Sequence, residues 1–213
     1  MSLYPGAQGA NILRDLVATI QRNAAYLSEL DGAVGDGDHG VNMSKGFGMA
    51  LQRLNADADV SGVLDTLGNT LLGEIGGAMG PLYGTFFLDM AAACRGKADI
   101  DAATFGAMLR AGLDGVQDLG GAAAGDKTLL DTLIPAQAQY AAALAEGVPF
   151  AEALKRMAMA AEAGRDATLD MVAKIGRASR LGERSRGHVD AGAASCFLIL
   201  GSMAATLVGG LTG

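Results

Sequence analysis

The sequence predicts an all-α protein, a single domain over residues 1–213 built as an antiparallel bundle of eight helices. Half of the residues are hydrophobic, but only 5% are aromatic and tryptophan is absent, a composition typical of closely packed helices rather than sheets. Apolar residues recur at helical spacing through most of the chain. With only four prolines and no serine-rich stretch, the chain contains no evident linker between domains.

Each predicted helix rests on apolar residues three or four positions apart, such as Ile12, Leu16 and Ile20 in the first. The segments with this spacing are residues 12–27, 43–54, 60–75, a stretch through Phe86, Phe87 and Met90, and residues 102–119, 127–144, 150–174 and 191–213.

Glycine-rich breaks interrupt this pattern after the first, third, fifth and seventh helices. They lie near residues 32–40, 76–84, 120–125 and 176–192. In a bundle of alternating up and down helices, every second connection lies at the same end. We therefore expect the four breaks to meet at one end of the molecule.

Charge and cysteine usage narrow the class of protein. A formal net charge of −7 argues against a nucleic-acid partner. Cys94 and Cys196 have no partner motif, so we expect two reduced, packed thiols and a cytoplasmic location. The N-terminus shows no signal peptide. Residues 191–213 are uncharged and long enough to span a bilayer, but their Gly, Ala, Ser and Thr content favours a central buried helix and no membrane.

Three aspartates fall within eight residues in the first break. Glycines at 32, 35, 37 and 40 are expected to prevent regular helix or strand there, and the carboxylates repel one another unless a cation such as Mg²⁺ binds them. The backbone amides that open the following helix are suited to phosphate. The alternative is a solvated turn with helix-capping aspartates. The residues in question are Asp31, Asp36 and Asp38 for metal, and His39, Gly40, Val41 and Asn42 for phosphate.

Three familiar motifs are excluded. Residues 35–40 fit G-x-G-x-x-G, and residues 120–128 resemble a P-loop, but neither follows a predicted strand. An EF-hand starting at either Asp31 or Asp36 places Asn42 or Phe47 at its twelfth position, where calcium requires glutamate.

The other three breaks contain residues suited to binding the phosphates and the base of a nucleotide. Residues 176–188 hold arginines able to bind phosphate oxygens, although a solvated basic loop is the alternative. Asp126 either contributes to a site or simply caps a helix. Met79 and Leu129 would line a slot for a nucleobase or fill the core.

Five motifs follow one another along the whole chain: residues 35–43 (GDGDHGVNM), 76–85 (GGAMGPLYGT), 125–128 (GDKT), 176–185 (GRASRLGERS) and 187–192 (GHVDAG). In these motifs the chain resembles the nucleotide-binding L subunit of dihydroxyacetone kinase and the equivalent C-terminal domain of single-chain kinases. The resemblance implies an antiparallel barrel of eight helices with the nucleotide site at one end. It also implies the ligand sets. Two Mg²⁺ ions are expected to be held by Asp31, Asp36 and Asp38, and phosphate by His39, Gly40, Val41 and Asn42. The nucleotide is expected to contact Ala78, Met79, Gly120 and Leu129. Arg177 is expected to be a phosphate-binding and catalytic arginine, and the segment closing over the nucleotide is expected to be Asp190, Ala191 and Gly192.

Two residues depart from the family pattern: Met79 stands where a small hydroxyl residue is expected, and Arg180 where an aromatic is common. The resemblance further implies transfer of a phosphoryl group from a phosphocarrier subunit of a phosphotransferase system, through bound ADP/ATP, to dihydroxyacetone held on a sugar-binding kinase subunit. Two alternatives remain: an ATP-exchanging kinase subunit for dihydroxyacetone or a four-carbon ketose, and a non-catalytic nucleotide-sensing regulator. A homodimer is left open.

Overall fold

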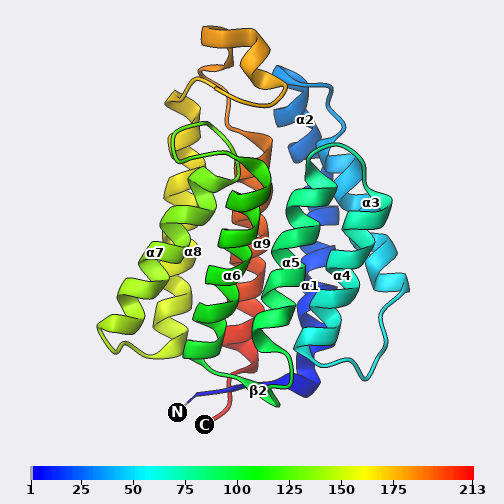
Figure 1. The fold of residues 1–213 in the computed structure, drawn as a ribbon, viewed down its shortest axis with the longest axis vertical. Coiled ribbons are helices and arrows are strands. Elements are labelled where there is room, and N and C mark those ends of the chain that lie inside the picture. The colour runs from blue at the N-terminus through cyan, green and yellow to red at the C-terminus, as the bar shows by residue number, and fades with distance from the viewer. Residues whose placement is uncertain (1) are drawn as a thin grey trace.

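The computed structural model describes residues 2–213, which form nine α-helices and one two-stranded antiparallel pair (Figure 1). The all-α expectation is confirmed. The helices are α1 Gly9–Arg22, α2 Ala24–Val34, α3 His39–Gln52, α4 Val60–Glu74, α5 Met79–Cys94, α6 Ala102–Gly120, α7 Leu130–Ala145, α8 Phe150–Ala167 and α9 Ala191–Gly210. Short 3₁₀ turns are η1 Gly6–Gln8, η2 Thr168–Asp170 and η3 Ala178–Ser185, and β1 Tyr4–Pro5 pairs with β2 Asp99–Ile100.

The helices close into a barrel. Neighbours from α4 through α9 pack in chain order, α9 packs against α1, and α1 packs against α4, with α3 also on α1 and α4. Apolar faces such as Ile12, Leu16 and Ile20 of α1 point into the shared core. Edge-to-face contacts of Phe87 with Phe47 and Phe86 fill part of it.

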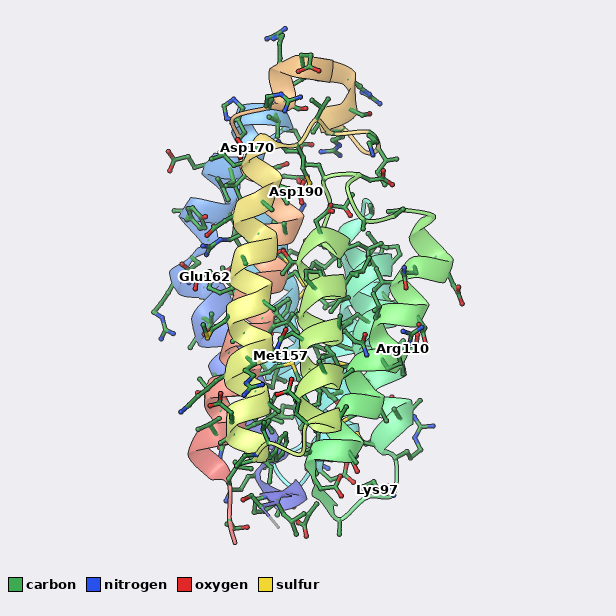
Figure 2. The ribbon with its side chains drawn as sticks, turned by 90° about the vertical axis from the view of Figure 1, so that its left-hand side faces the viewer. Lys97, Arg110, Met157, Glu162, Asp170 and Asp190 are labelled. Atoms are coloured by element: carbon green, nitrogen blue, oxygen red, sulfur yellow. The ribbon has the colours of Figure 1, made fainter. Side chains whose placement is uncertain are left out.

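The four glycine-rich breaks meet at one end of the barrel, as predicted, and both chain termini lie at the other end (Figure 1). The connections at the first end comprise residues 35–38, 75–78, 121–129 and 168–190. We call this end the loop end. Figure 2 shows Asp170 and Asp190 toward it and Lys97 at the opposite end.

The predicted first helix is in fact two. Asn23 interrupts it with φ −106° and ψ 7°, and its side-chain amide donates to the Thr19 carbonyl. The second of these helices, α2, continues to Val34, so Asp31 and Gly32 are helical. The expectation of an irregular segment from 31 to 40 was therefore wrong for its two ends, while residues 35–38 are irregular as expected. Glycine weakens a helix by only about 1 kcal/mol, which the packing of α2 against α3 and α9 outweighs.

Other helix ends also differ from the sequence pattern. α5 begins at Met79 and contains most of the second break, because Pro81 lies in the first turn, where no N–H is needed. Gly84 then lets α5 approach α4, since a Cβ there would lie 2.9 Å from the Leu72 Cβ. α7 begins at Leu130 rather than residue 127, because Lys127 has a left-handed φ of 63°.

The uncharged C-terminal segment forms α9, which packs against α1, α7 and α8. α9 forms part of the barrel wall. It is not the central helix that the sequence predicted, because Ala205 and Gly209 are exposed on its outer face. Within residues 2–213 it is the one helix long and apolar enough to cross a membrane, and 56% of its most apolar window is buried inside the protein.

Candidate functional site

The three aspartates of the first break converge at the loop end. Asp31 projects from the last turn of α2, and Asp36 and Asp38 lie in the short link to α3. One carboxylate oxygen from each lies within 4.8 Å of the others. Asp36 and Asp38 are exposed, and Asp31 is half-buried. Oxygen donors at this spacing, open to solvent, fit a hard divalent cation that retains water or phosphate ligands.

Arg177 of the fourth break reaches this carboxylate cluster. Its guanidinium forms an ion pair with Asp36 and lies 4.0 Å from Asp38. Because the Arg177 side chain is 56% exposed, the pair contributes at most about 1 kcal/mol to stability. The contact therefore places a positive charge beside the aspartates and contributes little to the stability of the fold.

The N-terminus of α3 faces the same cluster. The His39 backbone N–H donates to Asp31 Oδ2 over 3.3 Å, and Gly40 packs so closely on the Ala24 carbonyl that a Cβ would overlap it. Helix N-termini carry free N–H groups and partial positive charge, so this one is suited to an anion. Carboxylates for a cation and amides for an anion lie side by side.

A buried hydrogen-bond chain leads inward from His39. Its Nε2 lies 2.9 Å from Ser195 Oγ of α9, and Ser195 Oγ lies 2.7 Å from the Tyr83 hydroxyl of α5. Burial lowers the pKa of His39 and raises the pKa of Tyr83 well above its usual value. Tyr83 and Ser195 were not predicted as site residues from the sequence, although a serine within an apolar helix was a usable signal.

The third break is organised by two buried charged residues that the sequence analysis also missed. The Asp131 carboxylate accepts from the Gly125 and Thr128 backbone N–H groups over 2.5 and 2.8 Å. The Lys127 side chain, 2% exposed, donates from Nζ to the carbonyls of Met171 and Ser185 over 3.0 and 2.5 Å. Lys127 thereby ties the third break to the segment that carries Arg177.

The predicted closing segment lies against the third break. A Cβ on Gly192 would sit 3.5 Å from the Leu129 backbone nitrogen. Asp190 caps α9 by accepting from the Ala193 N–H over 2.8 Å, and its own N–H donates to Thr168. Two predicted nucleotide positions from different breaks are thus neighbours.

The remaining predicted residues share the loop end without joining the carboxylate cluster. Ala78 precedes α5 and is exposed, and Met79 opens that helix. Gly120 ends α6 beside Leu82. Within residues 2–213 no hydrogen bond or ion pair links Ala78, Met79 or Gly120 to the aspartates. A separate groove of about 500 Å³ between α1 and α9 contains no predicted site residue.

Asp190 provides a pH-dependent test of this architecture. Burial raises its pKa to about 6 from an ordinary 3.8. A carboxyl whose pKa is raised by folding stabilises the protein below pH 4, and this contribution is lost as the pH rises through about 6. Asparagine also caps helices. The Tm of Asp190→Asn should therefore rise relative to that of the unsubstituted protein as the pH increases from 4 to 7. Thermal melts across this range measure the difference, with Asp59→Asn, at the exposed cap of α4, as the control for replacing a capping carboxylate by an amide.

Comparisons with known proteins identify relatives of this chain. The DAK2 domain matches residues 33–205. The chain is 39% identical over 181 residues to the PEP-dependent dihydroxyacetone kinase, ADP-binding subunit DhaL, of Escherichia coli K12, covering 84% of this chain and 86% of that protein. It is 31% identical over 205 residues to the L-erythrulose kinase of Pectobacterium atrosepticum, covering 94% of this chain but 34% of that protein.

The fold also matches a solved structure. The dihydroxyacetone kinase from C. freundii, crystallised in complex with AMP-PNP and Mg²⁺, superposes with a TM-score of 0.68 at 25% identity. The match covers 93% of this chain and 34% of that one, so the chain spans about a third of the solved kinase.

Proposed function

The chain belongs to the DAK2 domain family, and from this premise we propose that it is the ADP/ATP-binding, phosphoryl-transferring subunit of a dihydroxyacetone kinase. The observation that carries the proposal is the carboxylate cluster beside the N-terminus of α3. The similarity to a stand-alone ADP-binding subunit over 86% of its length supports it. Single-chain kinases share this domain over about a third of their own length.

In this proposal, separate residues of the chain bind the metal ions and the phosphates. Asp31, Asp36 and Asp38 hold two Mg²⁺ ions, whose chemistry is to spread the charge of the β- and γ-phosphate oxygens. His39 and the first amides of α3 bind the phosphates. Arg177, already beside Asp36, supplies positive charge to the transferring group.

The nucleobase and the segment that closes over the nucleotide lie in the rest of the loop end. Ala78, Met79, Gly120 and Leu129 contact the nucleotide, and Asp190, Ala191 and Gly192 close over it. The approach of Leu129 to Gly192 supports a shared wall. Met79 offers a thioether where a hydroxyl is common in the family, so its contact with the nucleotide is apolar.

The sugar is held by a partner, a sugar-binding kinase subunit, which docks at the loop end in the cytoplasm. Five of the seven large hydrophobic side chains exposed in the described residues surround that end, a distribution typical of protein contact surfaces. We call them the apolar rim: Val41, Leu72, Leu119, Leu169 and Ile175. The phosphoryl donor is a phosphocarrier subunit of a phosphotransferase system. The similar subunits of Escherichia coli and Lactococcus lactis belong to a PEP-dependent and a PTS-dependent dihydroxyacetone kinase, respectively, which supports this donor.

Reconstitution tests the function. The chain is mixed with a sugar-binding kinase subunit, a phosphocarrier system fed by phosphoenolpyruvate, and dihydroxyacetone. We expect dihydroxyacetone phosphate only when all components and substoichiometric ADP are present. Product formation from ATP alone, with ADP lost rapidly on dialysis, would instead favour an ATP-exchanging kinase. Absence of any phosphorylated ketose, including erythrulose phosphate, would favour a nucleotide-sensing regulator.

A further inference from the structure

Asp131 holds the third break in a shape that the start of α7 does not require. We propose that Asp131 is a positioning residue, which fixes residues 125–128 so that Leu129 and the segment carrying Arg177 are held in place together. The predicted nucleotide contact and the predicted phosphate-binding arginine then both depend on one buried carboxylate. The consequence for nucleotide binding rests on the proposed function, whereas the coupling between the two breaks does not.

Part of the Asp131 geometry is ordinary helix capping. Thr128 Oγ1 accepts from the Leu130 N–H over 3.2 Å, and Asp131 Oδ2 accepts from the Thr128 N–H over 2.8 Å. This pattern is typical of a capping box, in which an acidic side chain three residues into the helix returns to the backbone of the capping residue. A capping box needs only this one oxygen of the Asp131 carboxylate.

The second oxygen of the carboxylate reaches further back along the chain. Asp131 Oδ1 accepts from the Gly125 N–H, six positions away, over 2.5 Å. Because both partners of Asp131 are backbone N–H groups, which can only donate, the direction of both hydrogen bonds is fixed. The Asp131 side chain is 6% exposed, so the carboxylate has little access to water as a substitute partner. Asp131 therefore closes residues 125–128 into a loop around a buried acceptor.

The closed loop contains a strained residue. Lys127 has a left-handed φ of 63°, and within residues 2–213 it is the one residue other than glycine with such an angle. L-residues avoid this region, so the conformation persists only where surrounding contacts hold it. In this conformation the Lys127 side chain is buried, and its ammonium donates to the Met171 and Ser185 carbonyls.

The same loop contacts both predicted parts of the nucleotide site. The Asp126 carbonyl accepts from the Lys174 N–H over 3.1 Å, which joins the loop to the fourth break. On the other side, the Leu129 backbone nitrogen lies 3.5 Å from the position of a Cβ on Gly192. The loop therefore links the segment of Arg177 to the segment that closes over the nucleotide.

Hydrogen exchange of the nucleotide-free protein tests the coupling. Asparagine has the shape of aspartate, but one of its two terminal groups is a donor, so Asp131→Asn keeps at most one of the two hydrogen bonds. We expect exchange in this variant to accelerate roughly tenfold between residues 123 and 129, and also between residues 171 and 187. An unchanged rate between residues 171 and 187 would overturn the proposal.

Thr128→Ala is the matched control, because it removes the capping oxygen and leaves the Gly125 bond in place. Its exchange should accelerate only in the first turn of α7. If Thr128→Ala accelerates exchange between residues 171 and 187 as much as Asp131→Asn does, capping alone is responsible and the proposal fails.

A further measurement needs no variant at all. In the unsubstituted protein the Gly125 amide should exchange at least roughly tenfold more slowly, relative to its intrinsic rate, than the amide of the exposed residue Ala124. The physical reason is that the Gly125 N–H donates to a buried carboxylate. Equal protection of the two amides would contradict the closed loop.

Binding of Mg²⁺·ADP measures the consequence for a ligand. The Kd of Asp131→Asn should rise roughly tenfold for ADP and by less for pyrophosphate, which has phosphates but no base to contact Leu129. Equal increases would overturn the joint role of the loop. Asp101→Asn, at the corresponding cap of α6 at the opposite end of the barrel, is the control, and its Kd should stay within about twofold.

The exchange and binding measurements can fail independently. Accelerated exchange in Asp131→Asn with an unchanged Kd would refute the positioning role and leave nucleotide binding intact. If the unsubstituted protein binds no ADP, the proposed function fails, and hydrogen exchange still decides whether Asp131 couples the two breaks. Thermal melts establish that each variant folds.

Discussion

Asp36→Asn is expected to lower Mg²⁺-dependent nucleotide affinity by at least ~100-fold, or about 2.8 kcal/mol at 1.4 kcal/mol per factor of ten. The substitution keeps the size of the side chain and removes the charge that a hard cation needs. The fold should survive, because Asp36 is exposed and its pair with Arg177 contributes little. Removing one of three neighbouring like charges also relieves repulsion.

Calorimetry of ADP binding with and without Mg²⁺ measures this effect. Asp57→Asn, an exposed aspartate in the connection before α4, is the control and should bind like the unsubstituted protein. The difference between variants should vanish without Mg²⁺, because only the metal-dependent part of binding involves the carboxylate. Equal affinity of Asp36→Asn and the unsubstituted protein in Mg²⁺ would contradict the metal role.

Lys127→Met is expected to loosen the segment that carries Arg177 and to weaken nucleotide binding roughly tenfold. The Lys127 ammonium holds the Met171 and Ser185 carbonyls, which bracket Arg177 in sequence. Each bond from a charged donor contributes about 1.5–3 kcal/mol. Burial of the ammonium opposes this, as the lowered pKa of Lys127 shows, and such penalties reach several kcal/mol.

Because these contributions oppose each other, the effect of Lys127→Met should be local rather than global. Hydrogen exchange should accelerate between residues 171 and 187, while the Tm changes by only a few degrees. Lys155→Met, on the exposed face of α8, is the control and should alter neither quantity. Unchanged exchange in this segment would show that Lys127 does not hold it.

The sequence alone predicted the helices and their common end because both depend on local pattern. Apolar spacing identifies a helix face, and the alternation of up and down helices decides which connections meet. The carboxylate cluster was equally predictable, since Asp31, Asp36 and Asp38 are too close in sequence to lie far apart. The predicted helix ends were less accurate, because glycine and proline signals near residues 32 and 81 were outweighed by packing and by position in the first turn.

The residues that the sequence analysis missed are those whose partners are distant along the chain. Ser195 meets His39 across 156 positions and Tyr83 across 112, and Lys127 meets Ser185 across 58. Nothing in the local pattern of a serine in an apolar helix, or a lysine after a glycine turn, names such a partner. The sequence by itself determined an all-α chain with acidic, basic and glycine-rich segments at one end. Only the tertiary structure decided which buried polar groups face one another, because a buried donor and acceptor are paired by the packing of whole helices rather than by their own neighbours.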